Sequence, residues 1–452
     1  MYKYLAIINF IESQIESGAL QEGAKLPSIR ELANQFICNK STIIKALQEV
    51  EKKHIIYSVS KSGYYVIKKN FKQKSSMTDA IDFATSAPNW TQFPYIDFQH
   101  CINKAIDTYQ QDLFIYGTPK GLPSLIDVVQ KQLTMYQVFA KNEQIFITSG
   151  VQQALFILTM LPFPNGRNKI VIEQPSYHLF IEYLNVKGVP VVPIKRTAQG
   201  IDLAELEQIF SGKDVKFFYT MPRFHNPLGT SYTQKEKAAI AKLAEKYEVY
   251  IVEDDYLADF EQNLKADPIF SYDVSNRVIY LKSYSKIMFP GLRIGVAVLP
   301  EKLIEGFQQY KKITDIDSSM ISQAALEIYI KSGMFERHQT KVKQSYFTRA
   351  EQLYQSLEKH LQADSVFKPV VRPSSISVNA HIALPKNVNA NQVIKHLAEQ
   401  NVYLQSLNCN YLPNVKQERL LKFNVSNVEE SKIDEGIQLV VKELIHRRNW
   451  FV

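Results

Sequence analysis

The hydrophobic and polar positions near the N-terminus repeat with a helical period. The apolar run YLAIINFI is followed by Glu12 and Glu16 at helical spacing, which predicts an amphipathic helix and no signal peptide. The later stretch LPSIRELANQFICNKSTIIKALQEVEKKHII predicts two short helices separated by a turn at residues 37–39. Ser28 stands three residues before Glu31, which is the spacing of a capping box at the start of the first of these two helices.

The second of these helices has an apolar side and a polar side. Ile43, Leu47 and Val50 recur at helical spacing and are expected to face inward. The polar residues left outside near its N-terminus are Lys40, Ser41, Thr42 and Lys45. After the helix, IIYSVSKSGYYVI alternates around a Lys61-Ser62-Gly63 turn, which predicts a hairpin. Helix, turn, helix and basic hairpin in this order favour a DNA-reading module over a small bundle with solvated lysines.

From residue 83 the pattern changes to short apolar runs that alternate with amphipathic helical stretches. The runs KIVIE, VKFFYTM, EVYIVEDD and RVIYLKS predict buried strands, each ending in polar residues. This alternation is typical of an α/β body with a mainly parallel sheet and helices on both faces. A polar, basic stretch, KKNFKQKSSMTDA, precedes the change. We therefore predict a head at residues 1–70, a linker at residues 71–82 and a body at residues 83–452.

Length, charge and cysteine content narrow the class of protein. With 452 residues, 45% of them apolar, the chain exceeds one hydrophobic core, so at least two domains are expected. The formal net charge is +8, and residues 1–75 hold twelve Lys/Arg against six Asp/Glu, so +6 of it lies near the N-terminus. Cys38, Cys101 and Cys409 are scattered, which predicts no disulfide framework, no metal site and a cytoplasmic protein. No stretch approaches the ~20 apolar residues of a membrane span, so no membrane partner is expected.

Four short stretches carry residues that are typical of a cofactor site. SYSKIMFPGLRIG holds Lys286 and Arg293, TMPRFHNPLG holds Asn226, and VEDDYLADF holds Asp254 and Tyr256. In ITSGVQQAL a strand end meets a helix start, whose free backbone N–H groups around Val151 and Gln152 form a natural phosphate seat. Each stretch alone is equally compatible with a turn or a solvated strand end. Ligands of open α/β sheets bind outside the carboxyl ends of the strands, where these residues are expected.

Residues 1–70 resemble the winged helix-turn-helix of the GntR family of bacterial regulators, in which LPSxRxLA precedes the recognition helix. The resemblance implies binding to double-stranded DNA, with the second helix in the major groove and the hairpin as a wing. The residues that it implies at the DNA are Arg30, Lys40, Ser41, Thr42, Lys45 and Gly63. Asn39 and Lys40 replace the arginine that is usual in the turn, so the resemblance does not extend to base preference.

Residues 83–452 resemble the fold-type I aminotransferases, which use pyridoxal 5'-phosphate (PLP), because the four stretches occur in the order of that family. The resemblance implies that Lys286 forms the Schiff base with PLP and that Asp254 pairs with the pyridine nitrogen. It also implies that Asn226 and Tyr256 donate to the ring oxygen. A buried carboxylate there would keep the ring nitrogen protonated, which PLP needs to act as an electron sink.

The same resemblance implies which residues contact the phosphate and the ring face of PLP. Ser283 and Arg293 bind the phosphate, and an arginine fork suits a dianion. Tyr177, in EQPSYH, matches the aromatic residue that stacks on the ring. Tyr116, in YGTPKGL, matches a tyrosine that reaches the phosphate from the other subunit, which implies a homodimer.

One stretch departs from the aminotransferase pattern. Fold-type I enzymes commonly carry an arginine near the C-terminus, in a strand of the form LRLxF, that holds the substrate carboxylate with two parallel hydrogen bonds. Here LLKFNVSN puts Lys422 at that position, with Arg419 as the other candidate for effector binding. Three residues along a strand reverse the side-chain direction, so the two are not expected to face the same cavity. A lysine lacks the planar two-point grip, so poor transamination is expected.

A GntR-like head on an aminotransferase-like body is the arrangement of the MocR subfamily of regulators. We therefore predict a PLP-dependent transcriptional regulator that senses PLP, or an amine or amino-acid effector, through its body. Its paired heads are expected to bind an operator with two half-sites. Two alternatives stay open: a PLP-dependent aminotransferase with a secondary DNA-binding head, and a DNA-binding dimer whose body is only a scaffold.

Overall fold

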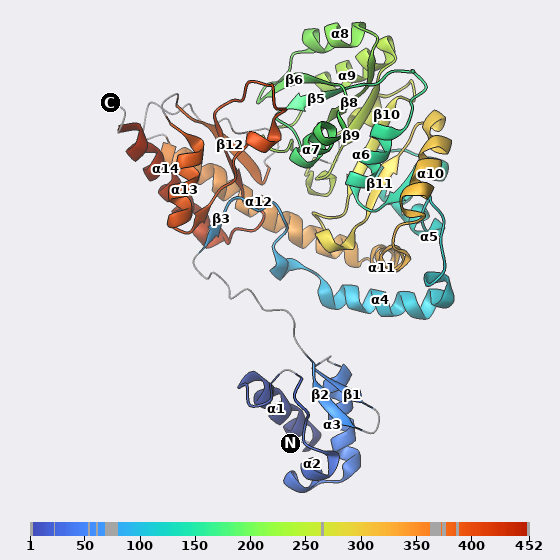
Figure 1. The fold of residues 1–452 in the computed structure, drawn as a ribbon, viewed down its shortest axis with the longest axis vertical. Coiled ribbons are helices and arrows are strands. Elements are labelled where there is room, and N and C mark those ends of the chain that lie inside the picture. Colours follow the sequence, from blue (N-terminus) through green and yellow to red (C-terminus); the bar gives the residue numbers. More distant parts are fainter. Residues whose placement is uncertain are drawn as a thin grey trace. The chain divides into compact units, whose positions relative to one another are not determined.

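The computed structural model divides the chain into two compact units, Met1–Asp79 and Ala80–Val452, which Figure 1 draws as one ribbon. The structure describes residues 3–21, 23–52, 55–59, 62–67, 80–263, 266–361, 372, 377–385 and 388–449. Lys61 of the predicted hairpin turn and residues 71–79 of the predicted linker lie outside the described residues.

The head has the predicted order of helix, turn, helix and hairpin. Its elements are α1 (Lys3–Glu16), α2 (Ile29–Gln35), α3 (Lys40–Lys52), β1 (Ile56–Val59) and β2 (Gly63–Val66), the last two paired antiparallel. The capping box is confirmed: Ser28 Oγ accepts from Glu31 N at 3.3 Å, and Glu31 Oε2 accepts from Ser28 N at 2.6 Å. Ile37 has a φ of +47° in the turn between α2 and α3. Residues with no exposed surface include Ile7, Leu32, Ile43, Leu47 and Val50.

The body is built on a sheet with the strand order β4-β11-β10-β9-β8-β5-β6-β7. The strands are β4 (Ile145–Thr148), β5 (Lys169–Gln174), β6 (Val191–Thr197), β7 (Gly200–Ile201), β8 (Val215–Thr220), β9 (Tyr250–Asp254), β10 (Val278–Ser283) and β11 (Gly295–Val298). The four predicted strands correspond to β5, β8, β9 and β10, and neighbours among them pair parallel, as predicted. β11 runs antiparallel to β10 and β4, and β7 antiparallel to β6.

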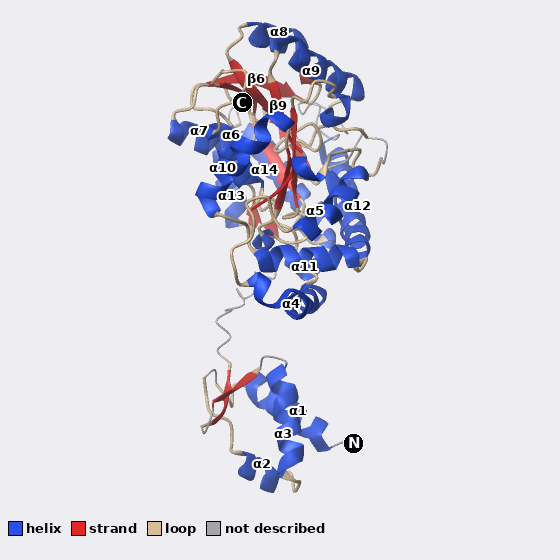
Figure 2. Cartoon of the chain, turned by 90° about the vertical axis from the view of Figure 1, so that its right-hand side faces the viewer, coloured by secondary structure: helices blue, strands red, loops and turns tan. Residues whose placement is uncertain are grey.

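Helices cover both faces of this sheet because successive strand side chains point in opposite directions. Ile170 and Tyr219 pack with α6 (Val151–Met160), α7 (His178–Lys187) and α10 (Glu301–Asp315). Val171, Phe218 and Ile251 pack on the other face with α8 (Leu203–Ser211) and α9 (Gln234–Tyr247). Further helices of the body are α4 (Tyr95–Tyr109), α5 (Pro123–Thr134) and α11 (Met320–Lys331). Figure 2 shows the strands between helices. Within the described ranges, no helix has both the length and the apolar character to cross a membrane.

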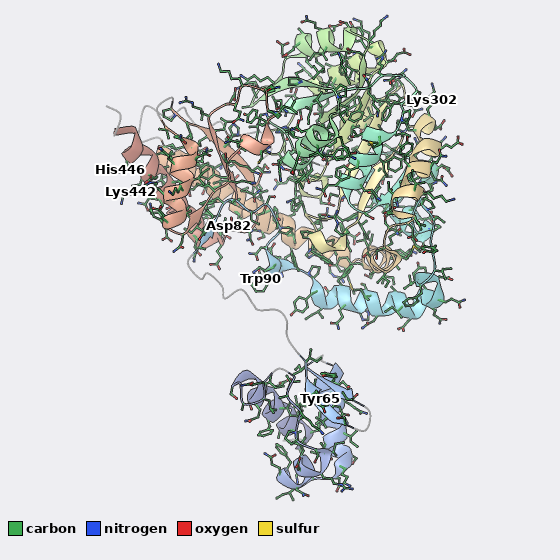
Figure 3. All side chains as sticks on the ribbon, viewed as in Figure 1. Tyr65, Asp82, Trp90, Lys302, Lys442 and His446 are labelled. Atoms are coloured by element: carbon green, nitrogen blue, oxygen red, sulfur yellow. The ribbon has the colours of Figure 1, made fainter. Side chains whose placement is uncertain are left out.

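A smaller layer of strands and helices follows the long helix α12 (Met334–Leu361). β12 (Asn379–Ala383) pairs antiparallel with β14 (Leu420–Asn424), beside α13 (Ala390–Glu399) and α14 (Ile433–Asn449). β13 (Val402–Tyr403) pairs parallel with β3 (Ile81–Asp82), and Figure 3 labels Asp82 at this point. Residues 81 and 82 were predicted in the linker, but their backbone pairing makes them the first strand of the body.

Candidate functional site

A cavity of about 370 Å³ lies at the carboxyl ends of β8, β9 and β10. Asp254 is the last residue of β9, Ser283 is the last residue of β10, and Asn226 lies in the loop after β8. The predicted residues that line this cavity are Val151, Gln152, Tyr177, Asn226, Asp254, Tyr256, Ser283, Lys286, Arg293 and Lys422. The parallel sheet therefore brings the four sequence stretches together, as this class of fold requires.

Asp254 is a buried carboxylate with one unused oxygen. The side chain is 4% exposed, and its Oδ2 accepts a hydrogen bond from the Tyr219 hydroxyl at 2.8 Å. Its Oδ1 is buried and accepts no hydrogen bond from the described residues. Burial raises the pKa of Asp254 to about 7. A buried acceptor without a donor fits a ligand N–H, and the protonated ring nitrogen of PLP is such a donor.

The start of α6 and Arg293 form a seat for an anion. Gly150 precedes the helix with a φ of +85°, and a Cβ atom added there would lie 2.9 Å from Arg293 Nη2. A Cβ atom added to Gly295 would lie 2.8 Å from Val151 N. Arg293 Nη2 donates to the Ser149 carbonyl at 3.0 Å. Free N–H groups at a helix start beside a guanidinium suit the phosphate of PLP.

Two lysine amines occupy the same cavity. Lys286 Nζ donates to the Ser86 carbonyl, and Lys422 Nζ donates to Asn226 Oδ1 at 3.3 Å. Burial, with a smaller effect from the charge of Lys422, lowers the pKa of Lys286 to about 8. Burial lowers the pKa of Lys422 to about 8 as well. Lys286 is thus unprotonated for part of the time near neutral pH, and the free amine is the nucleophilic form.

Two tyrosines of the predicted site are already engaged by hydrogen bonds. The Tyr177 hydroxyl accepts from Gln152 Nε2 at 2.9 Å, and burial raises the pKa of Tyr177 to about 12. The Tyr256 hydroxyl donates to the Phe224 carbonyl at 2.8 Å and accepts from Asn379 Nδ2 at 3.1 Å. The resemblance implies that Tyr256 donates to the ring oxygen of PLP, whereas in this structure its proton points to the backbone.

Two predicted residues do not line the cavity of their own chain. Tyr116 is 79% exposed and lies outside it. Arg419 is exposed and borders a different depression, together with Asn389 and Ser406. The structure therefore brings Lys422, and not Arg419, to the cavity, in agreement with the alternation of side chains along β14.

Several residues of the cavity carried no signal in the sequence. Ser86, His178 and Gln405 line it, and Asn379 holds Tyr256 from the neighbouring layer. His178 directly follows Tyr177, so the stretch EQPSYH contained it without indicating a role. Ser86 and Gln405 reach the cavity, and Asn379 reaches Tyr256, only through long-range packing, which no local motif reports.

Glu173, on β5, has no exposed surface and holds the loop after β8. Its carboxylate accepts from Met221 N at 3.1 Å. Arg196 Nη1 lies 3.2 Å from the same carboxylate, and His225 Nε2 lies 3.3 Å from it. Burial acts to raise the pKa of Glu173, but His225 and Arg196 outweigh it and lower the pKa to about 2. Because His225 precedes Asn226, this network fixes the backbone that presents Asn226 to the cavity.

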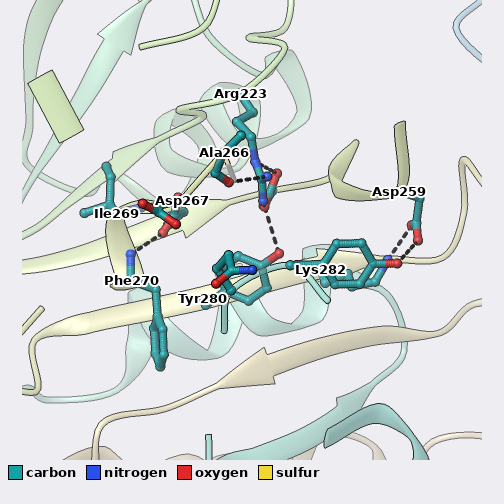
Figure 4. A network of polar contacts seen from close by, with 12 residues as sticks. Arg223, Asp259, Ala266, Asp267, Ile269, Phe270, Tyr280 and Lys282 are labelled. Carbon is teal, nitrogen blue, oxygen red and sulfur yellow. Dashed lines mark hydrogen bonds and ion pairs between the residues drawn. The ribbon is translucent and has the colours of Figure 1, made fainter. Parts of the chain in front are cut away.

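A second buried network supports the neighbouring strand ends. Arg223 pairs with Asp255, which also accepts from the Tyr280 hydroxyl at 2.8 Å (Figure 4). Lys282 pairs with Asp259 in the same view. Each of these five side chains is at most 2% exposed. Together they fix the ends of β9 and β10, where the cavity begins.

The head presents a basic surface on α3. On α3, Lys40, Ser41 and Lys45 are exposed and Thr42 is half-buried, and Arg30 is exposed on the preceding helix α2. Lys45 Nζ lies 5.2 Å from the centroid of the Tyr4 ring on α1. Gly63 begins β2 with a φ of +123° and pairs with Val59 of β1.

Family models match both units of the chain. The model of class I and II aminotransferases matches residues 78–440, and that of the bacterial regulatory proteins of the gntR family matches residues 3–66. The chain is 54% identical to the uncharacterized HTH-type transcriptional regulator YcxD of Bacillus subtilis strain 168, over 98% of this chain and 100% of that protein. The chain belongs to the GntR family and has the MocR architecture. The predicted family is thereby confirmed.

The body of this MocR-type chain is also similar to enzymes. It is 26% identical to aromatic-amino-acid aminotransferase 1 of Thermococcus litoralis, over 81% of this chain and 88% of that enzyme. The structure of Pyrococcus horikoshii kynurenine aminotransferase in complex with PMP matches with a TM-score of 0.74 at 26% identity, covering 82% of this chain and 92% of that one. The predicted fold-type I body is confirmed, but a shared fold does not by itself establish a shared activity.

The pKa of Lys422 predicts how carboxylate binding depends on pH. The ammonium form attracts an anion, and it is lost as the pH rises through about 8. An amino acid that changes the absorbance of the PLP-loaded protein should therefore bind more weakly above pH 8. Lys422→Arg stays charged over this range, so the ratio of wild-type to variant affinity isolates Lys422. We expect this ratio to fall by up to about tenfold per pH unit above 8; a constant ratio from pH 6 to pH 10 would contradict the prediction.

Proposed function

We propose that this chain is a PLP-dependent transcriptional regulator. Its head binds promoter DNA, and its body senses PLP itself or an amine or amino acid that reacts with PLP. The observation that carries the proposal is the combination, in one chain, of an exposed basic helix α3 and a cavity whose Asp254 Oδ1 accepts no hydrogen bond from the described residues. Because its DNA target lies in the bacterial cytoplasm, we assign the protein to that compartment.

The residues of the cavity fit PLP. Asp254 would hold the proton of the ring nitrogen, and Ser283 and Arg293 would bind the phosphate beside the start of α6. When bound, PLP supplies an aldehyde that captures amines and a ring that withdraws electrons. The chain's own part is to keep Lys286 partly unprotonated in a buried site and to cover the ring with Tyr177.

Lys422 favours effector binding over efficient turnover. A guanidinium holds a carboxylate through two parallel hydrogen bonds, whereas an ammonium attracts it as a point charge. The amine of Lys422 also shares its hydrogens with Asn226 Oδ1 at 3.3 Å. A ligand held in this way is oriented less strictly, and loose orientation slows a proton transfer more than it weakens binding.

Ser86 supplies a route from the cavity to the head. Its carbonyl accepts a hydrogen bond from Lys286 Nζ, and it lies four residues after β3 ends at Asp82. β3 is the first strand of the body, and the chain before it leads to the head. A ligand that engages the Lys286 amine removes the donor of the Ser86 carbonyl. We infer that this loss loosens residues 83–89, which follow β3 in the chain.

Tyr116 supports a homodimer. It is 79% exposed, and its neighbours Phe114 and Ile115 are 70% and 63% exposed. A run of large exposed apolar residues is typical of an interface. We propose that Tyr116 reaches the phosphate seat of a second copy. One dimeric body then carries two heads, which suits an operator with two half-sites.

DNA binding should depend on the charges of α3. Lys45→Ala should weaken binding of promoter DNA and lower the slope of log affinity against log salt by about 1, because one phosphate contact is lost. Lys302→Ala is the matched control, because Lys302 is an exposed lysine on α10 of the body (Figure 3). Electrophoretic mobility shifts at several salt concentrations measure both variants. Equal slopes for Lys45→Ala and the wild type would count against the head as the DNA-binding unit.

Transamination should stop early. When the PLP-loaded protein is mixed with a panel of amino acids and a keto-acid acceptor, we expect a change in absorbance that ends after one equivalent. Lys422→Arg should increase the product formed, because it restores the two-point grip. Sustained wild-type turnover at about 1–10³ per second would instead support the aminotransferase alternative.

Hydrogen exchange should report the link between Lys286 and Ser86. The amides of residues 83–89 should exchange faster in the PLP-loaded protein than in the free protein, because the Ser86 carbonyl loses its donor. In Lys286→Ala the same amides should exchange fast in both states. The central strand β9 serves as the internal reference. Equal exchange of this segment in the free and loaded wild type would rule out the proposed route.

A further inference from the structure

The solvent side of α3 carries one large apolar side chain among polar ones. The exposed positions of this helix include Lys40, Ser41, Ile44, Lys45 and Gln48. At about 100° per residue these positions form one stripe along the helix. Ile44 lies inside the stripe, between Lys40 and Gln48, and is 37% exposed.

Packing within the head does not explain Ile44. Its neighbours Ile43 and Leu47 have no exposed surface and belong to the hydrophobic cluster of the head, whereas Ile44 is not part of that cluster. A β-branched residue is also a poorer helix former than the lysines beside it. The exposed side of Ile44 therefore gains free energy only when something outside the head covers it.

We propose that Ile44 contacts the C5-methyl group of a thymine in the major groove and thereby sets a base preference of the operator. The inference rests on the proposed function, because it takes DNA as the partner of α3. Lys40 and Lys45 on the same stripe, and the net charge of +6 over residues 1–75, match a polyanion. Ile44 has no hydrogen-bonding group, and the thymine methyl is the apolar group that the major groove offers.

The thymine methyl can be removed from DNA without changing the base sequence. A genomic fragment that the full-length protein selects is amplified either with dTTP and thymine-containing primers or with dUTP and uracil-containing primers, so that the second product lacks every thymine methyl. Covering one methyl group is worth about fourfold in affinity, and two heads together about fifteenfold. At fixed salt, we expect the wild type to prefer the thymine fragment by a factor of this size.

The variants assign the preference to Ile44. Ile44→Ala keeps a good helix former at this position, and its ratio of affinities for the two fragments should fall close to one. Leu5→Ala is the matched control, because Leu5 is 39% exposed on α1 and loses the same apolar groups. It should keep the full wild-type ratio. Circular dichroism verifies that both variants are folded.

The outcomes separate this inference from the proposed function. A wild type that binds both fragments equally, or an Ile44→Ala variant that keeps the wild-type ratio, would overturn the thymine contact. Ile44→Ala binding that is weaker by the same factor on both fragments would also overturn it, because another group would then cover Ile44. In each of these cases, salt-dependent binding to DNA would still support the proposed function as a transcriptional regulator. If the full-length protein selected no genomic fragment at all, the result would contradict the proposed function itself.

Discussion

The body depends on the buried carboxylate of Glu173. Besides its contacts with Arg196 and Met221, it accepts from the Tyr232 hydroxyl at 2.5 Å, and the Arg196 guanidinium lies 3.5 Å from the centroid of the Tyr232 ring. Glu173 thus binds Met221 at the start and Tyr232 near the end of the loop between β8 and α9. Breaking a buried pair by removing one partner costs about 3–5 kcal/mol, because the other charge stays buried. Asn226 lies in this loop. Glu173 therefore holds one wall of the cavity in place, although Glu173 itself does not line the cavity.

The same logic separates three consecutive carboxylates at the end of β9. Glu253 accepts from Ile269 N and Phe270 N at 2.9 Å each, and both residues are labelled in Figure 4. Asp255 pairs with Arg223. Only Asp254, among these three described side chains, keeps a buried oxygen without a hydrogen bond. The carboxylates of Glu253 and Asp255 are engaged by contacts within the body, whereas Oδ1 of Asp254 can accept a hydrogen bond from a ligand.

The sequence predicted most of what rests on local periodicity and little of what rests on long-range packing. The capping box of α2 and strands β5, β8, β9 and β10 follow from short patterns, and all are present. Strand β3 was missed because two residues carry no period, and its partner β13 lies far along the chain. The alternation along β14 correctly separated Lys422 from Arg419. The hydrogen bond from Tyr256 to the Phe224 carbonyl was not foreseen, because a motif fixes a position and not the direction of a proton.

Under the proposed function, the two lysines of the cavity give it different responses to an amino acid and to a plain carboxylate. The charge of Lys422 helps to lower the pKa of Lys286, so a carboxylate that pairs with Lys422 lets the pKa of Lys286 rise. In the PLP-free protein a simple acid therefore favours the ammonium that holds the Ser86 carbonyl. Under the proposed function PLP engages Lys286, and an amino acid takes the place of Lys286 there with its own amine, so the freed Lys286 amine can donate to the Ser86 carbonyl again. A plain carboxylate carries no amine and cannot make this exchange, so the cavity would distinguish the two ligands without completing a transamination.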